Sequence, residues 1–65
     1  MNPKNRTISI QCEILRRTDR ALLLEFRSAE NNRITVEWFP LSLITEIHPD
    51  HVVMEEWIAT RKGAA

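Results

Sequence analysis

The 65-residue chain has little of several residues that common functional sites require. Its single cysteine cannot form a disulfide within the chain, so we expect a reducing, cytoplasmic setting. Its single glycine excludes the glycine-rich loops that hold phosphate groups in nucleotide-binding folds. No apolar run approaches the ~18 residues of a membrane span, and no signal-peptide pattern is present. We therefore expect one small domain over residues 1–65, with no membrane partner.

Neither sign of charge predominates, because nine basic residues balance nine acidic ones. This neutral total argues against a strongly basic nucleic-acid binder but leaves room for a local patch. Residues 1–33 carry seven bases and four acids, a balance of +3, whereas residues 34–65 carry two bases and five acids, a balance of −3. The surface is dipolar if these halves stay apart in the fold, and a meander that interleaves them would cancel the field.

What the chain does have is apolar content, at 43% of residues. This is the composition of a globular domain rather than of a disordered segment. A chain of this size buries only about 60% of its unfolded surface, so its stability is expected to be marginal. A partner that covers apolar surface would help, and a homo-oligomer is the expected solution because two-fold dimers are the commonest.

Alternation of apolar and polar residues predicts a mainly β protein. Residues 1–6 are polar and predict a flexible leader, and residues 55–62 predict a C-terminal helix, with Gly63 just beyond its end. Residues 16–20 and 28–33 are polar and predict turns; the second has Asn31 and Asn32, which tolerate positive φ, at its tip. Five strands are predicted, over residues 7–14, 21–27, 34–39, 44–48 and 52–54.

This element order favours a small five-stranded antiparallel meander, curled into a barrel of SH3-like or OB-like type and followed by the short helix. The alternative is an open antiparallel sheet with the helix packed on one face.

Two segments carry a resemblance to known sequences. Residues 36–44 contain a strand followed by Trp, an apolar residue, Pro, any residue, Ser, any residue and Ile, and residues 54–63 contain Glu-Trp-apolar-Ala followed by Lys-Gly. Together and in this order they resemble a group of short phage and prophage proteins, over the C-terminal half of the chain. The group usually has Pro where Glu55 stands and often Gln where Leu43 stands. The resemblance implies a small viral-type accessory protein and carries no catalytic residues.

The aromatic residues are the first interaction candidates. Trp38 is in phase with Ile34 and Val36, which predicts that it belongs to the core. The alternative is that Trp38 and Pro40 form a recognition surface for a peptide or an unstacked base. Phe39 points to the opposite face: it is exposed and an interaction candidate if the sheet is one-sided, and core if both faces are covered. Trp57 is expected to dock the helix on the sheet, the alternative being a solvent-facing anchor for a partner.

Arginine supplies the second set of candidates. Arg is preferred over Lys for bidentate contacts with phosphate and carboxylate groups. The candidates are Arg16, Arg17, Arg20, Arg27 and Arg33, three of which lie in one predicted turn. That turn is either a phosphate or carboxylate contact or an ordinary solvated turn that Asp19 partly neutralises.

Residues that could support catalysis or metal binding are few. Cys12, His48 and His51 are the only soft metal ligands, one short of the four that a structural zinc site takes. Cys12 is also in phase with buried positions, so it is interpreted as a small apolar residue. The strand carboxylates are interpreted as a solvated, charge-mixed face; they are Glu13, Glu25, Glu37 and Glu46. We therefore expect no enzyme activity, no cofactor and no metal.

Two functions remain. The favoured one is a non-enzymatic protein-interaction module of phage or prophage origin that binds a host protein or a copy of itself, with inhibition of a host defence as one purpose. The alternative is a small nucleic-acid-binding barrel that uses the Arg-rich turn and a strand face.

Overall fold

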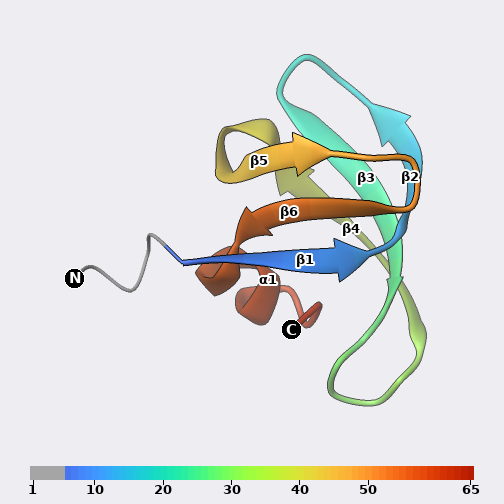
Figure 1. Cartoon of the computed structure of the whole chain (residues 1–65). Helices are drawn as coiled ribbons and strands as arrows, with labels where there is room; N and C mark the ends of the chain where they lie inside the picture. Colours follow the sequence, from blue (N-terminus) through green and yellow to red (C-terminus); the bar gives the residue numbers. More distant parts are fainter. Residues whose placement is uncertain (1–5) are drawn as a thin grey trace.

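The computed structural model describes residues 6–65, which form strands and one short helix (Figure 1). The elements, in chain order, are β1 (Thr7–Gln11), β2 (Glu13–Arg17), β3 (Ala21–Arg27), β4 (Ile34–Pro40), the 3₁₀ turn η2 (Leu41–Leu43), β5 (Ile44–Ile47), β6 (His51–Glu55) and α1 (Glu56–Arg61). The predicted leader lies outside the described residues except for Arg6, whose carbonyl accepts a 2.8 Å hydrogen bond from the Glu56 N–H.

The strands form two three-stranded antiparallel sheets, in the orders β1-β6-β5 and β2-β3-β4. They lie across each other, and α1 lies beneath β1 and β6 (Figure 1). The mainly β class and the short C-terminal helix are thus confirmed. Within residues 6–65, however, no strand of one sheet pairs with a strand of the other, so the predicted closed barrel is wrong.

The described residues form six strands rather than five because the predicted first strand is divided. Cys12 separates β1 from β2, and each part pairs in a different sheet. At this corner the Cys12 N–H donates to the Asp50 carbonyl at 3.1 Å. Further along, β2 has a register shift against β3 between Ile14 and Arg16 and continues to Arg17, so the polar turn is shorter than predicted.

The core lies between the sheets and is closed at one end by α1. Its fully enclosed side chains come from both sheets, and Phe26 and Phe39 meet edge to face with ring centroids 5.7 Å apart. Ile58 and Ala59 are the buried residues of α1, so they hold the helix against the sheets. The buried residues are Ile10, Leu22, Leu24, Phe26, Phe39, Val52, Met54, Ile58 and Ala59.

The phase of β4 is opposite to the one predicted. Phe39 is fully buried, whereas Trp38 is 40% exposed. The interpretation of Trp38 as core is therefore wrong, and of the two alternatives for Phe39 the core one holds, so Phe39 is not available to a partner. The inward side of β4 also carries the polar residues Thr35 and Glu37, which the core accepts because they lie at its open margin beside α1.

Local turn chemistry follows the sequence closely. The helix covers residues 56–61 rather than 55–62, and Gly63 follows it with a φ of 80°. The N–H groups of Gly63 and Ala64 donate to the carbonyls of Thr60 and Ala59, which is the Schellman arrangement. Asn32 has a φ of 60° in the β3–β4 turn, as its side-chain type predicts.

Candidate protein-interaction surface

Exposed apolar side chains gather on the outer side of β4. Ile34, Val36 and Trp38 are 56%, 45% and 40% exposed. They alternate with the inward residues of the strand, so they share one face. Leu23 lies directly opposite Trp38 in the neighbouring strand and extends the apolar area onto β3. We refer to Ile34, Val36 and Trp38, with the strand edge beside them, as the β4 surface.

The backbone of β4 is open along the edge that faces away from β3. β4 is an outer strand of its sheet, and within residues 6–65 it pairs with β3 alone. Two hydrogen bonds bracket the pairing: Ser28 N–H to the Arg33 carbonyl and Leu41 N–H to the Arg20 carbonyl, both 2.8 Å. In an antiparallel ladder, bonded and non-bonded pairs alternate. The N–H and C=O groups that point away from β3 therefore belong to Ile34, Val36 and Trp38.

A groove of about 760 Å³ lies on the inward side of β4, between that strand and α1. Lys62 crosses it: its Nζ lies 3.7 Å from Glu37 Oε1 and 5.8 Å from the centre of the Phe39 ring. Trp57 also lines the groove, is 36% exposed, and donates from Nε1 to Glu55 Oε1 at 3.1 Å. Trp57 thus keeps a solvent-facing side, and the buried docking contacts of α1 come from its neighbours.

The five candidate arginines do not form one patch. Arg16, Arg17 and Arg20 are exposed around the β2–β3 turn, at the upper end of the sheet in Figure 1. Arg27 and Arg33 lie at the opposite end of β3 and β4, where Arg27 Nη1 donates to the Asn32 carbonyl at 3.1 Å. The seven residues of β3 separate the two groups by roughly 20 Å, at about 3.4 Å per residue.

The Arg-rich turn is held by Thr18. Its Oγ1 accepts hydrogen bonds from the N–H groups of Arg20 and Ala21, at 3.2 and 3.0 Å. Within residues 6–65, none of the three turn arginines forms an ion pair. Their guanidinium groups therefore have no charge partner among these described residues, although the turn itself is well formed.

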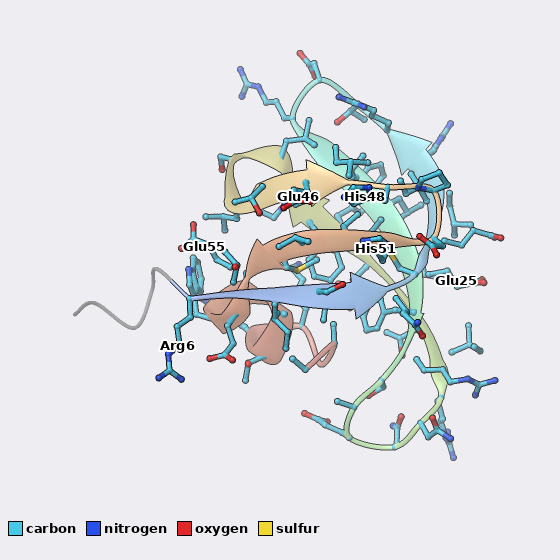
Figure 2. All side chains as sticks on the ribbon, viewed as in Figure 1. Arg6, Glu25, Glu46, His48, His51 and Glu55 are labelled. Atoms are coloured by element: carbon cyan, nitrogen blue, oxygen red, sulfur yellow. The ribbon has the colours of Figure 1, made fainter. Side chains whose placement is uncertain are left out.

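The two histidines stack where β5 meets β6. Their ring centroids are 4.3 Å apart and the rings are 13° from parallel; Figure 2 labels His48 beside Glu46 on the β5 side and His51 on the neighbouring β6. His48 Nε2 lies 2.9 Å from Glu46 Oε1, and His51 Nδ1 lies 2.6 Å from Asp50 Oδ1. The hydrogen bond from His51 holds the pKa of Asp50 below its usual value. In the described part of the chain, no group of three His, Cys, Asp or Glu side chains is arranged to hold a metal ion.

Cys12 is half-buried at the corner between β1 and β2. Burial raises the pKa of its thiol, with a smaller contribution from the charge of Asp50. A raised pKa reduces the thiolate fraction at neutral pH, so the environment does not activate this cysteine as a nucleophile.

Comparison with known proteins found no relative of this chain. The chain matches no family model, no curated protein and no solved structure. Among the helices of the described residues, none is both long and apolar enough to cross a membrane.

Sequence reasoning did not single out Ile34 and Val36 as surface residues. Both are β-branched and alternate with polar residues, which is the usual pattern of a buried strand face. The signal that could have found them is the pair Trp38-Phe39, because side chains next to each other in a strand point to opposite faces and only one can enter the core.

Proposed function

We propose that this protein is a small, non-enzymatic protein-interaction module that binds a protein through the β4 surface. The observation that carries the proposal is the juxtaposition of three exposed apolar side chains with open backbone groups of the same residues. Exposed apolar residues are ordinary when scattered singly, and they indicate an interaction site when contiguous. A partner that adds an extended segment to the β4 edge would gain main-chain hydrogen bonds and apolar contacts together.

The resemblance to short phage and prophage proteins supports the biological setting that we propose. Its two segments meet in the fold, since Pro40 and Leu43 of the first line the same groove as Trp57 and Lys62 of the second. We propose a phage or prophage accessory protein, in the cytoplasm, that acts by binding a host protein or itself, with inhibition of a host defence as its purpose.

The test compares two apolar positions of similar exposure. A protein captured by the tagged wild type is identified, purified and titrated against the wild type, Trp38→Ala and Leu15→Ala. Leu15 is 41% exposed but lies on β2, at the other edge of the sheet. We expect at least a tenfold loss of affinity for Trp38→Ala, about 1.4 kcal/mol or more, and wild-type affinity for Leu15→Ala. Equal affinities of all three proteins would contradict binding through the β4 surface.

A second candidate function is nucleic-acid binding by the Arg-rich turn, favoured by its exposed guanidinium groups, which form no ion pair with any residue from 6 to 65. Phosphate contacts of this kind weaken steeply as salt is added. We would expect a gel shift with single- or double-stranded DNA or RNA at about 50 mM salt, abolished by the double change Arg16→Ala, Arg17→Ala. The same double change should leave binding through the β4 surface intact, and the absence of any shift would exclude this candidate.

A further inference from the structure

Among the sheet edges formed by residues 6–65, β4 is the one that lacks the usual protection. Sheet edges are normally kept from pairing by shortness, bulges, charge or a covering element. β2 has a register shift and exposed arginines, and β5 has four residues and a register shift of its own. β1 packs against α1, and its exposed side chains are polar. β4 has seven residues in unbroken register with β3, and its three exposed side chains alongside open backbone groups are apolar.

We propose that the occupant of this edge is β4 of a second copy of the chain, paired antiparallel about a two-fold axis at Val36. The inference rests on the proposed function, because it names the partner of the same surface. With the axis at Val36, each outward-pointing residue of β4 meets another: Val36 faces the partner's Val36, and Ile34 faces the partner's Trp38. Each pair exchanges two backbone hydrogen bonds, and the apolar side chains of both copies form one cluster.

The two neighbouring registers of the β4–β4 pair are less favourable. An axis at Glu37 would set two carboxylates opposite each other and would bring Pro40, which has no N–H, against Ile34. An axis at Thr35 would bring Trp38 against Asn32, whose φ of 60° takes it out of the strand conformation. The register centred on Val36 is therefore the one in which every open backbone group of β4 finds a partner.

Charge complementarity supports a second copy as the occupant. In this register Arg33 becomes a diagonal neighbour of the partner's Glu37, a separation that long side chains reach. Arg33 is exposed and forms no ion pair within residues 6–65, and Glu37 is paired only with Lys62, at 3.7 Å.

Sedimentation of three proteins tests the proposal. The wild type is expected to dimerise at micromolar to submillimolar concentration, and Val36→Lys to dimerise at least tenfold more weakly, because it sets two ammonium groups against each other at the axis. The monomer should tolerate this change, since Val36 is 45% exposed and lies opposite Glu25. Leu15→Lys makes the same chemical change at a 41% exposed residue of β2 and should dimerise like the wild type.

A second measurement tests the register and does not depend on Val36→Lys being folded. Val36→Cys in a Cys12→Ser background should form a disulfide-linked dimer under mild oxidation, because paired strand residues at the axis lie within disulfide reach. Leu15→Cys in the same background should not. Arg33→Glu, an exposed change outside the core, should weaken the dimer by placing an acid near the partner's Glu37.

The outcomes separate this inference from the proposed function. A wild type that stays monomeric to about 1 mM overturns the inference, as does equal cross-linking of the two cysteine variants or undiminished dimerisation of both Val36→Lys and Arg33→Glu. If a captured heterologous protein still loses affinity for Trp38→Ala, the proposed function stands with a different partner. If neither dimer nor heterologous complex responds to changes in β4, both fail.

Discussion

At the scale of single residues, two adjacent aromatic side chains of β4 have opposite environments. Phe39 is enclosed, meets the ring of Phe26 edge to face, and has the Lys62 ammonium 5.8 Å from its ring centre. Trp38 leaves 40% of its surface to solvent and packs beside Leu23. The larger ring is thus the one available to a partner, while the smaller one stabilises the monomer.

This contrast predicts unequal costs of truncation. Phe39→Ala should lower the free energy of unfolding by about 3–5 kcal/mol, because it empties an enclosed core position. Trp38→Ala should lower it by less than about 1 kcal/mol, because the ring already contacts solvent. Urea unfolding followed by circular dichroism, at concentrations too low for self-association, measures both. Similar costs for the two variants would mean that Trp38 is packed more tightly than the structure shows.

At the scale of elements, the end of α1 depends on one backbone conformation. Gly63 has a φ of 80°, and a Cβ added there would meet Ser28 Oγ at 3.7 Å, an ordinary contact. Space is therefore available, and the constraint is the left-handed backbone. That conformation allows two hydrogen bonds that end the helix, from the Gly63 N–H to the Thr60 carbonyl and from the Ala64 N–H to the Ala59 carbonyl.

Gly63→Ala should therefore destabilise the protein by about 1–2 kcal/mol, the cost of a left-handed residue with a Cβ. Gly63→Asn should cost less, because Asn adopts this conformation more readily. Thermal unfolding of the two variants beside the wild type measures the difference. If Ala and Asn cost the same, the backbone conformation would not be the origin of the loss.

The elements also show how far the sequence could lead. Leu22, Leu24 and Phe26 share one face of β3 by simple alternation, and the structure buries all three. β4 could not be assigned in this way because both of its faces are apolar at one end. The structure buries Phe39 against Phe26 and places Glu37 beside Lys62 at the open margin of the core, and no local pattern in β4 records either contact.

The sequence pattern also does not indicate the break between β1 and β2. Cys12 keeps the apolar phase of Ile10 and Ile14, so the alternation runs through the corner without interruption. The division arises because β6 pairs with β1 and β3 pairs with β2, and no local pattern records which strand pairs with which. For the candidate site, the exposed arginines were predictable one by one, whereas their separation into two groups depends on the length of β3.

At the scale of the whole molecule, the two halves of opposite charge are interleaved. Residues 1–33 supply β1, β2 and β3, and residues 34–65 supply β4, β5, β6 and α1, so each sheet contains strands from both halves. A simple molecular dipole is therefore reduced, and the Arg-rich turn is a local feature. Recognition through the β4 surface depends on apolar and backbone contacts more than on the field of the whole protein.

If the dimer forms, the stability of the whole molecule depends on its concentration. Above the dissociation constant, a tenfold increase in protein favours the folded dimer by about 0.7 kcal/mol per chain, or about 3–5 °C in the unfolding midpoint of so small a domain. Calorimetry over a concentration series should show this rise for the wild type. The midpoint of Val36→Lys should stay constant over the same range, and a rise of equal size in that variant would contradict pairing at β4.

The corner at Cys12 has a consequence for how the molecule opens. The chain passes from one sheet to the other there, with one residue between strands, and returns through the three residues of η2 between β4 and β5. Because both connections are short, separating the two sheets would also break the pairing of a strand within one of them. Two small sheets that would be fragile apart are thereby joined into one cooperative unit, and a partner that clamps β4 restrains the far sheet as well.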